Sequence, residues 1–177
     1  GCVFLLSANA RAEMTLPVFD FETVEEARAA WSPAPGTPEV ELYEDGDETG
    51  LRFPVNFSPE EPRNYWDLSH EMDLSGESLF SLRLFIGNPD IISFFTFYFR
   101  TADGWYPASL PYLEEGWQTV KFNRMDFRTE GEPDGWGAIT GIRLSPWTGK
   151  AGQTDIIITE LRACNATVTL VNNTANS

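Results

Sequence analysis

The sequence predicts an all-β domain with one short helix near its N-terminus. Apolar and polar residues alternate over many short segments, and this period of two places them on opposite faces of strands. Gly, Pro, Asp and Asn separate the segments at short intervals, as turns require. Aromatic residues, which favour strands, make up 14% of the 177 residues. About ten strands at this spacing in one domain indicate a β-sandwich or a barrel.

The one clear helical segment is TVEEARAAW at residues 23–31. Thr23 can cap its first turn, and Glu26 three residues later completes a capping box. Pro33 and Pro35 end the helix, because proline disfavours helical geometry in the residue before it. The strands are predicted at 17–22, 39–44, 51–57, 63–68, 78–87, 91–100, 105–109, 117–123, 139–145 and 154–162.

Residues 1–12 have the features of a remnant of a secretory signal peptide, an apolar run followed by an A-x-A cleavage pattern at 10–12. Two alternatives stay open: an apolar N-terminal strand, or a lipoprotein signal with Cys2 acylated. The sandwich domain would then span 13–164, and 165–177 would be a tail, a linker or a final strand. An exported protein, secreted, periplasmic or held at the cell surface, is the expectation.

Charge and composition exclude several classes of function. The formal net charge is −15, from 27 acidic and 12 basic residues, whereas a nucleic-acid partner needs a basic surface. No segment approaches the roughly 18–20 apolar residues of a membrane span. With a single histidine, His70, and one cysteine outside the signal remnant, the chain offers no zinc site. His70 falls at a strand-end turn and has no companion residues for a catalytic triad. It also lacks a nucleophile elbow and a phosphate-binding loop, so we expect no enzyme activity.

Several strands mix cations and aromatic residues on the side opposite the core. In segment 139–147, Ile142 and Leu144 share one parity, whereas Arg143 and Trp147 share the other. If such strands are neighbours in one sheet, these side chains converge on one face. The candidate ligand-binding residues are Arg83, Tyr98, Arg100, Lys121, Arg143 and Trp147, bordered by Phe85, Trp117, Tyr65 and Asp67.

This combination suits sugar recognition. Flat aromatic rings can stack on sugar rings, and guanidinium groups offer a planar fork for hydroxyl, carboxylate or sulfate oxygens, so an acidic sugar would also fit. The alternative is an exposed sheet face whose cations pair with carboxylates and cover the aromatic rings. A second candidate set consists of loop aromatics, for which core packing is the alternative: Trp105, Tyr106, Tyr112 and Trp136.

Seven segments together resemble a known family. They are PVFDFE, YWDLS, LRLFIG, FTFYFRTADGWY, EEGWQTVKFN, DGWGAITGIRLSPW and DIIITELRA. From residue 17 to about 163 the chain is similar to galactose-binding-like jelly-roll domains, which occur as carbohydrate-binding modules and accessory domains of secreted bacterial proteins. The resemblance implies an antiparallel β-sandwich (jelly roll), first and last strands close together, and a ligand surface on a concave sheet.

The resemblance also implies a structural Ca²⁺ near the first and last strands. Such an ion needs oxygen ligands, which Glu22 and Glu160, with Asp20 and Asp155, could supply. Solvated surface carboxylates are the alternative.

The leading hypothesis is therefore a non-catalytic, carbohydrate-binding domain of an exported bacterial protein, with a polysaccharide or oligosaccharide as partner and further domains of a larger protein as neighbours. The alternative is a β-sandwich that packs against a protein or another domain and has no sugar site.

Overall fold

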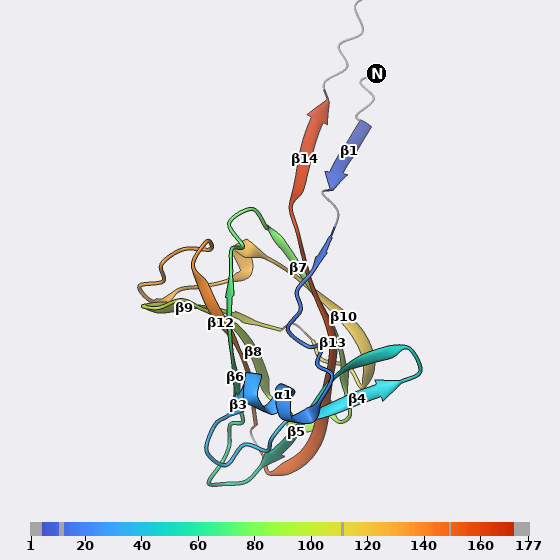
Figure 1. Cartoon of the computed structure of the whole chain (residues 1–177), viewed down its shortest axis with the longest axis vertical. Helices are drawn as coiled ribbons and strands as arrows, with labels where there is room; N and C mark the ends of the chain where they lie inside the picture. Colours follow the sequence, from blue (N-terminus) through green and yellow to red (C-terminus); the bar gives the residue numbers. More distant parts are fainter. Residues whose placement is uncertain (1–4, 11–12, 111, 149, 172–177) are drawn as a thin grey trace, which may run out of the picture.

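Two antiparallel six-stranded sheets lie face to face in the computed structural model, which describes residues 5–10, 13–110, 112–148 and 150–171 (Figure 1). Sheet I has the order β10-β7-β13-β5-β4, and β2 pairs with β13 at one end. Sheet II has the order β11-β9-β8-β12-β6-β3. This arrangement confirms the predicted antiparallel jelly-roll sandwich.

Every predicted strand except that at 17–22 overlaps an observed one. Sheet I contains β2 (Met14–Thr15), β4 (Glu41–Asp45), β5 (Glu48–Phe57), β7 (Leu79–Ile86), β10 (Gly116–Asn123) and β13 (Gly152–Cys164). Sheet II contains β3 (Trp31–Pro33), β6 (Trp66–Met72), β8 (Phe94–Arg100), β9 (Gly104–Ser109), β11 (Glu130–Gly131) and β12 (Ile139–Trp147). Two short 3-10 helices, η1 (Pro89–Ile91) and η2 (Arg124–Asp126), join strands.

The core between the sheets is built from the apolar parity of each strand. On β8, Phe95, Phe97 and Phe99 are buried, and on β7 every second side chain is buried as well. Phe97 and Phe99 lie edge to face, with ring centroids 5.0 Å apart. The alternation in the sequence therefore predicted correctly which side chains enter the core.

The helix α1 (Val24–Ala30) forms as predicted, and the Thr23 hydroxyl accepts the backbone N–H of Glu26 at 3.2 Å. The predicted strand at 17–22 is wrong, because pairing with β13 ends at Leu16, whose N–H donates to the Leu161 carbonyl. The apolar side chains after Leu16 pack in the core, and their backbone does not pair with another strand. Phe19 stacks on Trp31 at 5.3 Å, and the Trp31 indole N–H donates to the Val18 carbonyl.

A separate two-stranded ladder, β1 (Leu5–Ala10) with β14 (Ala166–Val171), projects from one end of the sandwich (Figure 1). The backbone at 5–10 is thus a strand, as in the alternative to a signal-peptide remnant. Part of that predicted remnant, 1–4 and 11–12, and the end of the predicted tail, 172–177, lie outside the described residues. β13 ends at Cys164, where the predicted sandwich domain ends.

No helix in the described part of the chain is long and apolar enough to cross a membrane.

Candidate ligand-binding face

The six predicted ligand residues divide between two sheets, so the prediction that they share one face is wrong. Arg83 on β7 and Lys121 on β10 lie in sheet I, and the other four lie in sheet II. Alternation along a strand separates core from outside, but it does not tell which sheet the strand joins. Tyr98, Arg100, Arg143 and Trp147 do share a face, because β8 and β12 are paired neighbours.

On sheet I, Arg83 is fully engaged by neighbouring side chains. Its Nε donates to Glu48 Oε1 at 2.6 Å, and its Cζ lies 4.5 Å from the centroid of the Trp117 ring. The hydrogen bond from Arg83 lowers the pKa of Glu48. Trp117 also contacts Tyr43 on β4, an edge strand at the other side of the sheet. These contacts agree with the alternative interpretation, in which cations of an exposed sheet face pair with carboxylates and cover aromatic rings.

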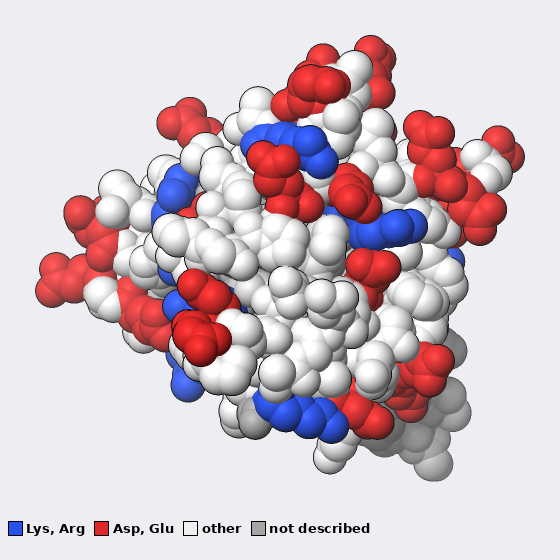
Figure 2. All heavy atoms as spheres, turned by 90° about the horizontal axis from the view of Figure 1, so that it is seen from below, with Lys and Arg blue, Asp and Glu red and all other residues white. Residues whose placement is uncertain are grey.

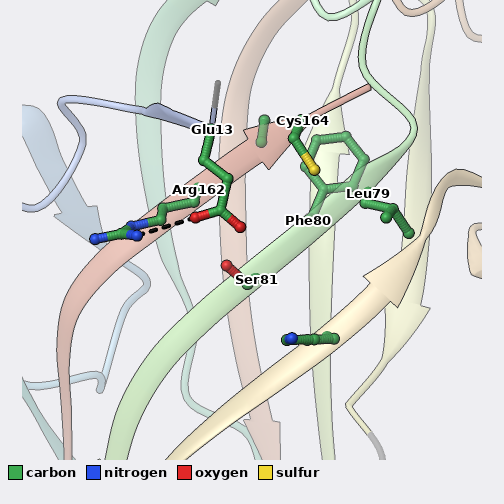
Figure 3. A pocket seen from close by; sticks show the side chains of 8 residues that line it. Glu13, Leu79, Phe80, Ser81, Arg162 and Cys164 are labelled. Atoms are coloured by element: carbon green, nitrogen blue, oxygen red, sulfur yellow. Dashed lines mark hydrogen bonds and ion pairs between the residues drawn. The ribbon is translucent and has the colours of Figure 1, made fainter. Parts of the chain in front are cut away.

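Lys121 is one of the residues that line a pocket of about 340 Å³ on sheet I. The Cys164 thiol also lines this pocket (Figure 3). An ion pair between Arg162 and Glu13, 2.9 Å long, forms one side of the pocket. Burial raises the pKa of the Cys164 thiol, so it stays protonated near neutral pH and is a poor nucleophile. This pocket is far from the shared face of β8 and β12 in the fold, because it belongs to the opposite sheet.

Arg143 is the centre of the sheet II face. It lies opposite Asp67 of β6 in the register, and its Nε and Nη2 donate to the two carboxylate oxygens at 2.6 and 2.8 Å. Its Cζ also lies 4.3 Å from the Tyr65 ring centroid and 4.4 Å from that of Trp105. Partial burial works to lower the pKa of Arg143, but the hydrogen bonds and charge of Asp67 outweigh it and raise the pKa.

Arg100 and Tyr98 complete the centre of this face. Arg100 Nη2 donates to the Ser69 hydroxyl at 3.1 Å, and its Nε donates to the Thr140 hydroxyl at 3.4 Å. The Tyr98 ring meets the Trp105 ring edge to face, with centroids 5.7 Å apart. Trp105, predicted as the first residue of a strand and also counted among the loop aromatics, lies on β9 and belongs to the face.

Arg63 belongs to the same face, although it was not among the predicted site residues. Its Cζ lies 4.6 Å from the Tyr65 ring centroid and 4.4 Å from that of Trp147. Its Nε donates to the Ser145 hydroxyl at 2.7 Å. Burial lowers the pKa of Arg63 from its ordinary value. The alternation of Arg63 with Tyr65 and Asp67 is the sequence signal that could have identified it.

We call these eight residues the arginine–aromatic face: Arg63, Tyr65, Asp67, Tyr98, Arg100, Trp105, Arg143 and Trp147.

One end of this face is open and apolar. Phe94 pairs with Trp147 in the register of β8 and β12, and the two side chains are 67% and 36% exposed. Beside Phe94, a hollow of about 570 Å³ is lined by Tyr112, which is 96% exposed, and Leu113. Large aromatic side chains this exposed and this close together commonly mark a binding surface. The centre of the face is packed, and this end is accessible.

The other predicted loop aromatics, Tyr106 and Trp136, serve packing. Their rings stack at 4.4 Å, and Trp136 also contacts Phe80 and Phe99 of the core.

The structure gives no support to a calcium site at Glu22 and Glu160. Among the described residues, no three His, Cys, Asp or Glu side chains gather in a way that could hold a metal. Glu160 Oε1 lies 2.8 Å from Arg162 Nε, which neutralises it. Ca²⁺ needs an oxygen-rich shell, and a site for it at the four carboxylates stays a prediction.

Figure 2 shows an end of the molecule that is largely uncharged, with more acidic than basic side chains, and the basic side chains there lie close to acidic ones. This pattern agrees with the formal charge of −15.

The comparison with solved structures gives clear likenesses in fold. A family 11 carbohydrate-binding module from Clostridium thermocellum, solved with a β-1,3-1,4-mixed-linked tetrasaccharide, matches with a TM-score of 0.58 and 17% identity, over 89% of this chain and 96% of that one. An agarase matches with a TM-score of 0.58 and 14% identity over 89% of this chain, and an exo-β-agarase with 0.57 and 12% over 92%. This chain covers 25% and 26% of those two enzymes.

No protein-family model matches the chain, and no curated protein sequence matches it. At these identities the structural likeness shows the fold, and it confirms the predicted jelly-roll sandwich.

Proposed function

Because the chain has the jelly-roll fold of carbohydrate-binding modules, we propose that it binds a glycan without cleaving it, on the outer face of sheet II. The observation that carries this proposal is the open end of the arginine–aromatic face, where Phe94 and Trp147 lie side by side and exposed. Their rings would stack on the apolar faces of sugar rings. The guanidinium of Arg63 and the phenol of Tyr98, close by on the same face, would bind hydroxyl groups.

A wider setting follows from the same proposal. Two matched agarases contain this fold as about a quarter of their chains. We therefore place the domain in an exported bacterial protein that handles polysaccharide outside the cell, where further domains would supply any catalysis.

The chain offers a matched pair of tryptophans for the test. Trp147 on sheet II is 36% exposed, and Trp117 on sheet I is 37% exposed. Affinity electrophoresis against mixed-linkage β-glucan, agarose and a panel of other neutral and acidic polysaccharides would identify a ligand for the wild type. Trp147→Ala should then weaken binding about tenfold or more, whereas Trp117→Ala should leave it unchanged.

Two results would contradict the proposal. The first is no binding to any glycan by a folded wild-type protein, and the second is equal loss of binding in both tryptophan variants. Retention of the domain by a protein partner through Phe94 and Trp147, without glycan binding, would favour the alternative of a protein-packing sandwich.

A further inference from the structure

Arg63 differs from most arginines among the described residues, because no carboxylate forms an ion pair with it. Five others form ion pairs with Asp or Glu: Arg28, Arg52, Arg83, Arg143 and Arg162. Arg63 instead lies against the rings of Tyr65 and Trp147 and donates one hydrogen bond, from Nε to the neutral Ser145 hydroxyl.

The free donors of Arg63 are accessible. Neither Nη group makes a hydrogen bond to a described residue, and neither is among the buried side-chain atoms that lack a partner. The rings engage the face of the guanidinium, so the N–H bonds in its plane stay available to an acceptor. A planar pair of N–H donors matches two oxygens of a carboxylate or a sulfate.

The local charge balance points the same way. On the arginine–aromatic face Arg143 is neutralised by Asp67. Arg100 pairs in the register with Trp105, which in turn pairs with Glu130. Among the described residues of this face, Arg63 is therefore the positive charge with no carboxylate beside it. The whole chain has a formal charge of −15, which repels anions at long range. The Debye length is about 8 Å at physiological salt, so this repulsion is screened while a direct contact with Arg63 is not.

We infer that the glycan bound by this face carries an anionic group, a sulfate ester or a carboxylate, and that Arg63 binds this group. The inference rests on the proposed function and specifies its ligand class. Arg63 contacts Trp147 directly, so an anionic substituent reaches Arg63 when its sugar ring stacks at the open end of the face. Ser145, fully buried, fixes the guanidinium through Nε and leaves its far edge for the ligand.

Two matched pairs of probes test the inference and distinguish a sulfate ester from a carboxylate as the anionic group. One pair is a sulfated galactan and its chemically desulfated form, and the other is polygalacturonate and its methyl ester. Isothermal titration calorimetry should show about tenfold to a hundredfold tighter binding to the charged member of one pair, as expected for a charge-assisted hydrogen bond. The pair that shows the preference identifies the anion.

Arg63→Gln should bring the ratio of the two affinities to about one, and Arg63→Lys should keep part of the preference because it keeps the charge. Arg28→Gln removes an equal charge from the exposed surface of α1 and should leave the ratio unchanged. If the Gln variant fails to fold by circular dichroism, a full preference in a folded Arg63→Met variant overturns the role of Arg63.

If the protein binds the charged and neutral members equally and Trp147→Ala abolishes this binding, the inference of an anionic ligand is wrong. The proposed function then stands. A folded protein that binds none of the four probes and no other glycan overturns the proposed function together with this inference.

Discussion

Arg143 and Asp67 face each other across β12 and β6, and both carboxylate oxygens accept hydrogen bonds from the one guanidinium. Their side chains are 21% and 26% exposed, so water replaces either partner poorly. Arg143, a predicted ligand residue, thus has a structural role, because its pair with Asp67 connects two strands of sheet II. Arg63, free of such a partner, is the better candidate to bind a ligand.

Removal of one partner of this pair should destabilise the fold more than removal of both. Asp67→Asn leaves the Arg143 charge half-buried and unpaired, and we expect it to lower the free energy of unfolding by about 1–3 kcal/mol. In a double-mutant cycle with Arg143→Met, followed by urea denaturation, the two losses should not add. Additive losses would show that the pair contributes no coupling.

Gly141 allows β12 to approach β6 closely. A Cβ at this position would lie far inside contact distance of the Leu68 carbonyl, a backbone atom that cannot move alone. Gly141→Ala should therefore lower stability by about 1–3 kcal/mol or more. Gly76→Ala is the control, since a Cβ at Gly76 would meet nothing within 4 Å and should change stability by less than about 0.5 kcal/mol. A Gly141→Ala variant as stable as the control would contradict the close approach.

Acid should destabilise the protein through Glu48. The hydrogen bond from Arg83 lowers the pKa of Glu48 in the folded state, so its stabilising contribution is present above the ordinary carboxyl pKa. It is lost as the pH falls from about 4.5 through the lower folded-state pKa. Glu48→Gln should therefore be less stable than wild type at pH 7 and should lose less further stability between pH 5 and pH 3.

Glu60→Gln provides the comparison for this measurement by chemical denaturation. Glu60→Gln removes an equal charge from an exposed side chain that makes no hydrogen bond or ion pair among the described residues, so it is the matched control. Parallel profiles for wild type and Glu48→Gln would exclude this role for the Arg83 contact.

Phe94 and Phe97, three positions apart on β8, should separate binding from stability. Phe94 is 67% exposed, so Phe94→Ala should change the free energy of unfolding by less than about 0.5 kcal/mol while it weakens glycan binding. Phe97 is fully buried, and Phe97→Ala should cost about 3–5 kcal/mol. Thermal unfolding and affinity electrophoresis of both variants check this. Unchanged glycan binding by Phe94→Ala would remove Phe94 from the site.

Local patterns in the sequence were sufficient for the strands and the core. The alternation of Phe95, Phe97 and Phe99 placed them inside, and Thr23 marked the start of the helix. The strand at 17–22 was predicted wrongly, because its apolar residues pack in the core, with Phe19 against Trp31, and do not pair with a neighbouring strand. Apolar alternation alone does not distinguish these two uses.

The candidate site was predicted in part, because its residues meet through strand pairing that a single sequence does not specify. Arg83 and Arg143 have the same parity on their strands, yet they lie on different sheets. Arg63 joins the site through Ser145, 82 residues further along the chain. Only the pairing of β8 with β12 and of β12 with β6 brings these side chains together.

The ladder of β1 and β14 determines how a pulling force would enter the domain. Leu5 pairs with Val171 at the outer end, and Ala10 pairs with Ala166 next to the sandwich. Tension applied to these two outer ends would act across the hydrogen bonds and break them one pair at a time, like a zipper. The short pairing of Met14 and Thr15 with β13 would follow, in sheet I. A ligand held on sheet II would therefore stay bound while the ends of the domain yield first.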